Sequence, residues 1–275
     1  MIDFLKNFSL RFPWVHDFFH WLGNNFRQIF LDLGAFSFFA AKAFRWTFQG
    51  LFHVRVWVEQ MMKIGVSSTP IVALVGLFSG MVFALQTGQA FKLFNAESLV
   101  GSTVGVALAR ELAPVFTALM IVARAGSGMA AEIGTMRVTE QIDALESMAV
   151  SPINYLVVPR LWATTLMMPL LVMIFNGLGL LGSYVVSVFL LEFCEGVYFF
   201  CYRYIVDPDD FYQGIIKAVF FGIALSLIAC YQGYSTRGGA EGVGKATTKA
   251  VVYGSVCVLV MNYFLAIWLI EWFRY

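Results

Sequence analysis

Hydrophobic residues occur in five long runs that hold few or no charges. The runs cover residues 64–91, 98–123, 161–191, 218–236 and 250–270. Each is long enough to cross the hydrocarbon core of a bilayer as a helix, which takes about 20 residues. The pattern therefore predicts an all-α membrane protein with five transmembrane helices. The composition agrees, because 60% of the residues are hydrophobic.

The first 63 residues follow a different pattern. They are aromatic and basic, but charged and polar residues interrupt every apolar stretch. This favours one or more interfacial helices lying along the inner leaflet. Residues 35–52 are more apolar, yet Lys42 and Arg45 break them, so partial insertion of this segment stays open. We divide the chain into an N-terminal interfacial amphipathic region, 1–63, and a transmembrane domain, 64–275.

Lysine and arginine gather in the loops on one side of the predicted membrane. If the N-terminus is cytoplasmic, the opposite side holds only Lys92, Arg203 and Arg274 outside the apolar runs. Cytoplasmic loops of membrane proteins carry the excess of these residues. We therefore expect a cytoplasmic N-terminus, an external C-terminus and a cytoplasmic loop at 124–160. The loop at 192–214 is then external.

The loop 124–160 is unusually polar for a chain in which 13% of residues are charged. Side chains on one helical face are mostly acidic, and those on a second face are apolar. The first face holds Glu132, Met136, Glu140 and Asp143, and the second holds Val138, Ile142, Leu145 and Ala149. This predicts an amphipathic helix that docks on a partner. A solvated connector and a helix on the membrane surface are the alternatives. Ser151 and Pro152 mark the start of the next helix.

Arg110 and Glu111 place two adjacent charges inside the second apolar run. A charge near the bilayer centre costs roughly 2.5–3.5 kcal/mol, so each needs a partner or water. Adjacent helical residues point about 100° apart, so the two do not pair with each other. Pro114 loosens the helix nearby. Either each charge pairs with a polar group or freed carbonyl of a neighbouring span, or both face a central cavity. Lys217 is a candidate partner of Glu111, a candidate headgroup contact, or a lysine that snorkels to the interface.

Cys194 and Cys201 share the predicted external loop. A disulfide between them is expected if that loop faces an oxidising compartment. Cys230 and Cys257 lie in apolar runs, where they are expected to be packing residues. The chain has no cysteine–histidine pattern for a metal, and its net charge of +1 gives no reason to expect nucleic acid.

Glycines recur at spacings that suit close helix packing. The string Gly177-Leu-Gly179-Leu-Leu-Gly182 resembles a dinucleotide fingerprint, but it lies inside an apolar run, so packing is the better explanation. The pairs Gly76/Gly80 and Gly101/Gly105 predict that spans one and two pack on each other or on a second copy. Residues 239–246 nearly match a phosphate-binding loop, but Ala246 replaces the magnesium ligand. We therefore do not expect this chain to bind ATP.

Several motifs together resemble the MlaE/YrbE family of ABC-transporter permeases. They are Arg110-Glu-Leu-Ala-Pro114, the stretch from Ala123 to Leu145, Tyr155-Leu-Val-Val-Pro-Arg160, Gly80-Met-Val-Phe-Ala-Leu-Gln86, and residues 239–248. The resemblance covers roughly residues 60–270. It implies a non-enzymatic homodimeric permease of the Gram-negative inner membrane that moves phospholipid. A separate cytoplasmic ATPase, which holds the ATP and Mg²⁺, and a periplasmic MCE-domain protein are the implied partners.

The resemblance also implies roles for individual residues. The stretch matching Ala131–Met148 corresponds to the coupling helix that docks on the ATPase. Contacts there are expected from Glu132, Thr135, Met136, Arg137, Glu140, Asp143 and Leu145. The lipid cavity between two copies is expected beside Arg110, Glu111, Lys217, Leu85 and Gln86.

Two other classes of protein remain as alternatives. A secondary transporter for an amphipathic solute would use intramembrane carboxylates for ion coupling, but it usually shows internal repeats, and none is visible. A non-transporting scaffold of a lipid-handling complex would keep the polar loop without needing Arg110 and Glu111. A neighbouring gene for an ABC ATPase would separate these alternatives from a permease.

Overall fold

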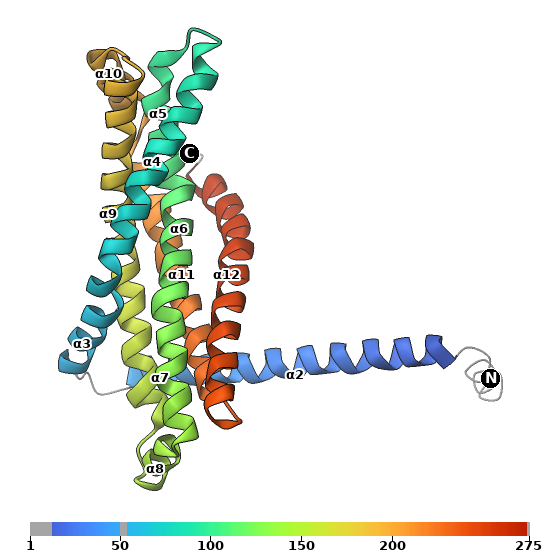
Figure 1. Ribbon diagram of the computed structural model, residues 1–275. Helices are drawn as coiled ribbons and strands as arrows, with labels where there is room; N and C mark the ends of the chain where they lie inside the picture. Colours follow the sequence, from blue (N-terminus) through green and yellow to red (C-terminus); the bar gives the residue numbers. More distant parts are fainter. Residues whose placement is uncertain (1–12, 50–53, 274–275) are drawn as a thin grey trace. The chain divides into compact units, whose positions relative to one another are not determined.

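The computed structural model describes residues 13–49 and 54–273, and these two ranges are almost entirely helical, without a strand (Figure 1). The chain divides into two compact units, Met1–Phe48 and Gln49–Tyr275. The second unit contains five helical segments that are long and apolar enough to cross a membrane. The predicted all-α membrane fold with five transmembrane helices is confirmed.

The first unit is described by one helix, α2 (Pro13–Gln49). Its 37 residues make a rod of about 55 Å, at 1.5 Å of rise per residue. Large apolar side chains on it, such as Phe30 and Phe38, are exposed. Among the described residues α2 does not qualify as a membrane span. The segment 35–52 is helical as far as Gln49, and residues 50–53 lie outside the described ranges.

The five candidate spans run somewhat beyond the apolar runs of the sequence. They are Arg55–Lys92, Glu97–Val138, Ile153–Leu190, Pro208–Tyr234 and Gly239–Trp272. A charged residue ends an apolar run but does not end a helix, because most charged residues are good helix formers. This is why the helices extend into the polar flanks.

Each span is built from consecutive helical elements. The first holds α3 (Val54–Ile64), η1 (Val66–Ser68) and α4 (Thr69–Lys92). The second holds η2 (Glu97–Leu99), α5 (Val100–Ala107), η3 (Leu108–Leu112), α6 (Ala113–Ile121), η4 (Val122–Gly126) and α7 (Ser127–Val138). The third holds η5 (Ile153–Val157), α9 (Val158–Val185) and η6 (Val186–Leu190). The last two are α11 (Pro208–Tyr234) and α12 (Gly239–Trp272). The short helices α8 (Gln141–Ser147) and α10 (Glu195–Ile205) lie at opposite ends of the bundle (Figure 1).

Helix α9 packs between α4 and α11 at the centre of the second unit. It crosses α4 at glycines: a Cβ on Gly80 would lie 1.9 Å from the carbonyl oxygen of Gly179, and one on Gly182 would lie 2.3 Å from that of Leu77. Side chains this small let two backbones touch, which is how helices associate without a hydrophobic driving force. The packing explanation of the glycine string is confirmed for Gly179 and Gly182.

Spans one and two do pack on each other, through α4 and α5, but the other two glycine pairs do not make that contact within this chain. Their packing on a second copy stays a prediction. Gly76 and Gly80 face the third span rather than the second. Gly101 and Gly105 face the rings of Tyr198 and Tyr202 on α10, which would lie 2.6 Å and 2.7 Å from a Cβ added to each glycine. The spacing of small residues marks a close contact but carries no information about which element fills it.

Helix α3 belongs with the membrane unit. Its Trp57 stacks on Trp162 of α9, with ring centroids 5.7 Å apart. A Cβ added to Gly65, the residue after α3, would collide with Met167, which also lies on α9. The compact unit therefore begins before residue 64, where the sequence pattern had placed the boundary. Of the five spans, α12 is the least buried and α11 is the most buried.

Candidate functional site

Arg110 and Glu111 lie in η3, a stretch of π-helix within the second span. Pro114 follows in the next element and has no N–H, so the carbonyl of Arg110 lacks the i+4 donor that an α-helix would supply. The ammonium of Lys217, on α11, donates to that carbonyl at 3.1 Å. A buried lysine from another span therefore bonds to a carbonyl beside the proline, a contact that the sequence analysis did not anticipate.

Glu111 joins three helical elements. Its Oε1 accepts from Lys217 Nζ at 2.6 Å, and its Oε2 accepts from Asn262 Nδ2 of α12 at 2.9 Å. The Lys217 side chain is only 1% exposed, whereas that of Glu111 is 42% exposed. A buried ammonium requires such a partner, so Glu111 holds α11 and α12 against the second span. The Oδ1 of Asn262 is buried without a partner among the described residues.

Arg110 forms the second ion pair. Its Nε and Nη2 both approach Oδ1 of Asp210 on α11, at 2.6 Å and 2.5 Å. Asp210 is 1% exposed and Arg110 is 42% exposed. Asp210 also accepts from the backbone N–H of Asp207 at 3.2 Å, in a capping box that begins α11. One carboxylate therefore caps a helix and neutralises an intramembrane arginine.

The two pairs share one arrangement. In each, the partner on α11 is buried, and the partner on η3 keeps two-fifths of its side chain exposed. The two alternatives for Arg110 and Glu111 are therefore not exclusive, because both residues are paired and both reach the surface of the chain. Asp210 and Asn262 were missed in the sequence. An acidic Asp-Pro-Asp-Asp helix start and a lone amide in an apolar run were the available signals.

Leu85 and Gln86 lie on α4. Leu85 is half-buried against the hydrophobic core, and Gln86 is exposed. Within the described ranges no hydrogen bond joins either residue to the two ion pairs. Their expected place beside a lipid cavity stays a prediction.

The polar loop at the other end of the second span is not one amphipathic helix, and that prediction was wrong. Helix α7 continues the span as far as Val138, and α8 begins at Gln141. Between them Glu140 takes a left-handed conformation, with φ of 60°. A side chain rarely adopts this conformation inside a helix, so the helix ends there. Of the predicted apolar face, Ile142 is fully buried while Val138 is exposed.

Glu132 does not belong to an open acidic face. Its Oε2 accepts from Arg160 Nη2 at 2.8 Å, and its Oε1 lies 3.9 Å from Lys63 Nζ. Arg160 is almost fully buried and also donates to the carbonyl of Leu156 at 2.7 Å. Glu132 therefore neutralises a buried guanidinium and ties α7 to α9 and α3.

A second cluster attaches α8 to α11. Arg137 Nη1 donates to Asp143 Oδ1 at 2.6 Å, and its guanidinium lies 5.7 Å from the centre of the Tyr234 ring. The Tyr234 hydroxyl donates to Glu146 Oε1 at 3.1 Å. Glu140 is exposed at the break. We call Arg137, Asp143, Glu146 and Tyr234 the loop clamp.

The other residues predicted to contact the ATPase differ in how exposed they are. Thr135 is exposed, and Met136 and Leu145 are half-buried. The structure thus brings Arg137 and Asp143 together, pairs the part-exposed Glu132 with the buried Arg160, and leaves Thr135 and Glu140 at the surface. Ser151-Pro152 does begin the next helix, as predicted, with the Ser151 carbonyl accepting from the Tyr155 N–H at 3.2 Å.

The disulfide expected between Cys194 and Cys201 does not form. Both thiols are free; Cys194 precedes α10 and Cys201 lies within it. Seven residues along a helix span about 10 Å, more than a disulfide bridges. The segment expected as an external loop contains this helix, and its Tyr198 packs edge-on to Tyr184 of α9 at 5.9 Å. Burial raises the pKa of the Tyr198 phenol, so it stays protonated beside the Ser183 hydroxyl, 3.1 Å away.

The chain is similar to known permeases over most of its length. The Permease MlaE family matches residues 57–268. A probable ABC transporter permease protein of Rickettsia felis is 42% identical over 232 residues, which are 84% of this chain and 90% of that protein. The intermembrane phospholipid transport system permease protein MlaE of Haemophilus influenzae is 41% identical over 214 residues, or 78% and 82% of the two chains. The chloroplastic protein TRIGALACTOSYLDIACYLGLYCEROL 1 of Arabidopsis thaliana is 34% identical over 225 residues, or 79% and 62%.

The matched region contains both intramembrane ion pairs, the loop clamp and most of each of the five spans. Its similarity to permeases extends along whole relatives rather than along one motif. The chain therefore belongs to the MlaE family of ABC-transporter permeases and is a transporter permease subunit.

Proposed function

We propose that this permease moves phospholipids between the inner membrane and a periplasmic MCE-domain protein, driven by a separate cytoplasmic ATPase that binds the ATP and Mg²⁺. The printed function of the Haemophilus relative, intermembrane phospholipid transport, supports the substrate. The names of the other relatives as ABC transporter permeases support the ATPase partner. The observation that carries the proposal is the pair of half-exposed charges at η3, each held by a buried partner on α11.

The two charges suit a phospholipid headgroup. A guanidinium binds a phosphate through two parallel hydrogen bonds. The Arg110 side chain stays partly exposed while its guanidinium is paired with Asp210. Glu111 presents a carboxylate nearby, which suits an ammonium. Acyl chains would lie on the apolar faces of α4 and α12, where Phe78, Tyr263 and Phe264 are exposed. Leu85 and Gln86 line the same path in this proposal.

A second copy of the chain completes the site in this proposal. Helix α12 exposes an apolar stripe along its length, which includes Val252, Val256, Leu259 and Tyr263. Apolar residues at i, i+4, i+7 and i+11 share one helix face. Pairing of such faces in a homodimer would place the two sets of half-exposed charges around one apolar space.

The α8 end is cytoplasmic in this proposal and the α10 end periplasmic. Lys63, Arg124, Arg137 and Arg160 lie towards the α8 end, and the positive-inside rule favours that end for the cytoplasm. The N-terminus is then cytoplasmic and the C-terminus periplasmic. The ATPase would dock on α8 and its flanks, with contacts from Glu140, Thr135, Met136 and Leu145.

Force would pass through the loop clamp in this mechanism. Arg137 and Tyr234 join α8 to the end of α11, and α11 carries Asp210 and Lys217 near its start. Closure of two ATPases would move α8, and α11 would carry the movement to Arg110 and Glu111. Nucleotide shifts the equilibrium only by its different affinity for the open and closed states.

The experiment is lipid transfer by the reconstituted complex, with ATPase rate and melting temperature measured alongside. Glu111→Gln keeps the size of the side chain but weakens the bond to Lys217, so we expect a folded complex with altered lipid transfer per ATP. Glu111→Leu removes both hydrogen bonds and should be more severe. A matched control is Glu241→Gln, because Glu241 is exposed and, among the described residues, its carboxylate pairs with Lys245 one turn away. Normal transfer by folded Glu111→Leu protein would remove Glu111 from the mechanism.

The same experiment tests the alternatives. A scaffold would bind the ATPase and the MCE protein without ATP-dependent transfer. A secondary transporter would transfer its solute without the ATPase and would respond to an ion gradient.

A further inference from the structure

Helix α10 runs lengthwise beside the start of the second span. A Cβ on Gly101 would lie 2.6 Å from the Tyr198 ring, and one on Gly105 would lie 2.7 Å from the Tyr202 ring. The two contacts are four residues apart on both helices, so α10 and α5 run side by side in the same direction. Helix α10 therefore follows the span towards the two ion pairs rather than lying across the end of the bundle.

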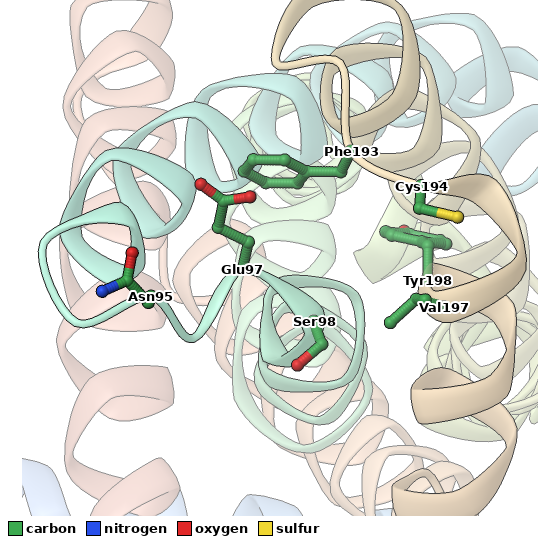
Figure 2. A pocket seen from close by; sticks show the side chains of 7 residues that line it. All are labelled: Asn95, Glu97, Ser98, Phe193, Cys194, Val197 and Tyr198. Atoms are coloured by element: carbon green, nitrogen blue, oxygen red, sulfur yellow. The ribbon is translucent and has the colours of Figure 1, made fainter.

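The start of α10 lies among polar side chains. Figure 2 shows it beside the turn between α4 and α5, where Asn95, Glu97 and Ser98 gather. The charges that end the nearby apolar runs, Lys92, Glu97 and Glu192, also belong to this end. Since α10 runs from here along the uncharged part of the second span, its later residues lie level with apolar segments.

The bilayer boundary can be located along the second span. Arg124 marks the opposite end of its apolar run, where it donates to Ser68 Oγ at 3.3 Å. A hydrocarbon core of about 30 Å takes about 20 helical residues, so a core that begins at Arg124 ends near Val104. The contact between Gly105 and Tyr202 therefore places the middle of α10 where the hydrocarbon meets the headgroups.

Helix α12 carries an independent marker of the same level. Its Asn262 donates to Glu111 at 2.9 Å, and Trp268 follows six residues later, about 9 Å further along the helix. Trp268 is exposed and thus lies level with Gly105 of the second span. Tryptophan and tyrosine gather at the headgroup level of membrane proteins. Two separate helices therefore place the boundary at the same height.

The outward face of α10 is aromatic. Phe200 and Tyr204 lie one helical turn apart, are 71% and 80% exposed, and stack with ring centroids 6.3 Å apart. They lie on the side of the helix away from the buried Tyr198. Large apolar rings are seldom left in water in this way. A face of this kind at the level of the bilayer boundary is suited to lipid.

The same surface continues onto the third span. The Phe199 ring lies 5.4 Å from that of Tyr184, which lies 6.2 Å from that of Phe189. Phe189 and its neighbour Leu190 are exposed at the end of this candidate membrane span. The aromatic face of α10 is therefore joined to a surface that a membrane span already turns outward.

A second copy of the chain is the less suitable occupant of this face. The apolar stripe that forms the dimer contact in the proposed function belongs to α12, and Figure 1 shows α10 and α12 on opposite sides of the bundle. A dimer formed through α12 therefore leaves the face of α10 uncovered.

We propose that α10 is an interfacial anchor, and that Phe200 and Tyr204 lie among the lipids of the leaflet at this end of the bundle. In the orientation of the proposed function this is the outer leaflet, but the lipid contact itself rests only on the transmembrane fold. Arg203 is exposed on the neighbouring flank, and its long stem can carry the guanidinium to the headgroups. Helix α10 leads directly into the capping box of α11, so the anchor fixes the height of Asp210 in the bilayer.

Photocrosslinking in a bilayer tests this contact. Phe200→p-benzoylphenylalanine and Tyr204→p-benzoylphenylalanine each keep an aromatic ring in the full-length chain, which is placed in nanodiscs of phosphatidylcholine. After irradiation, contact with lipid adds the mass of one phospholipid to the intact protein. The matched control is Phe94→p-benzoylphenylalanine, because Phe94 is 77% exposed but lies beyond Lys92, outside the boundary. Leu170→p-benzoylphenylalanine, at an exposed position within the third span, gives the yield for full lipid contact.

We expect lipid adducts at positions 200 and 204 to form several-fold more often than at position 94, and about as often as at position 170. Two positions keep the test available if one variant fails to fold. Equal yields at positions 94 and 200 would overturn the proposal, because exposure rather than height would then determine the contact. The proposal would also fail if position 170 reacted with lipid while positions 200 and 204 did not.

A second arm uses native membranes that contain the partner proteins. Lipid adducts at positions 200 and 204 should persist there. Crosslinks to a second copy or to a partner protein in place of lipid would assign the face to that protein and overturn the anchor. The nanodisc measurement needs neither ATP nor a partner, so failure of the transport proposal would leave it unaffected.

Discussion

The crossing of α4 and α9 gives the most direct structural prediction, through Gly80→Ala. The added methyl would lie 1.9 Å from the Gly179 carbonyl oxygen and 2.6 Å from its carbonyl carbon. These are backbone atoms, so no change of rotamer relieves the overlap, and the two helices must separate. The control is Gly177→Ala, because Gly177 lies on the same helix as Gly179 and a Cβ added there would have nothing within 4 Å.

The expected magnitudes have opposite signs. Replacing a helical glycine by alanine gains up to about 1 kcal/mol of helix propensity. Overpacking a close contact costs about 1–3 kcal/mol, and more where the backbone must move. Gly80→Ala should therefore lose roughly 2 kcal/mol net, which corresponds to a fall in melting temperature of roughly 4–8 °C for a chain of this size. Gly177→Ala should melt at the same temperature as the wild type or a few degrees higher.

The assay is thermal unfolding of the purified protein in one detergent, followed by size-exclusion chromatography at a fixed heating rate. A fixed rate is needed because membrane proteins of this size often unfold irreversibly. The reasoning would be refuted if the two variants melted together, or if Gly177→Ala were the less stable. Either result would mean that α4 and α9 do not cross at these glycines.

Three other predictions follow from the site. Glu140→Lys should weaken co-purification of the ATPase without changing the melting temperature. Asp143→Lys should reduce both the co-purification and the melting temperature, because it breaks a bond to Arg137. Equal melting temperatures for the two variants would contradict the loop clamp. Lys217→Met should destabilise the protein by up to about 3 kcal/mol, since it leaves a half-exposed carboxylate without its main partner; an unchanged melting temperature would show that water replaces the ammonium. Thiol labelling without reductant should modify Cys194 rapidly and Cys201 more slowly, and a requirement for prior reduction of both would restore the disulfide.

The intramembrane charges show where local sequence information ends. Arg110 and Glu111 stand out in the sequence because a charge in an apolar run is costly wherever it occurs, and Lys217 because it directly precedes the fourth run. Their partners do not stand out in the same way. Asp210 lies 100 residues from Arg110, and Asn262 lies 151 residues from Glu111, and nothing in the neighbouring sequence of either residue specifies the other.

The polar loop shows the same limit at shorter range. Helical spacing between Glu132 and Asp143 predicted one continuous amphipathic helix, because each residue in it is compatible with a helix. The structure ends the helix at Val138, before the left-handed Glu140, and pairs the part-exposed Glu132 with the buried Arg160. Tertiary contacts accompany this break, since the buried guanidinium of Arg160 pairs with Glu132 and the loop clamp attaches α8 to α11.

The sequence by itself determined the number of spans, their approximate limits and the all-α class. In a bilayer each helix satisfies its backbone hydrogen bonds within its own segment, so apolar length alone is sufficient to predict it. Only the tertiary structure decided which spans meet, which partner neutralises each charge, and that Gly76 and Gly80 face α9 while Gly101 and Gly105 face α10. These contacts join residues far apart in the chain, and their energies come from shape and charge across helices, which no local pattern encodes.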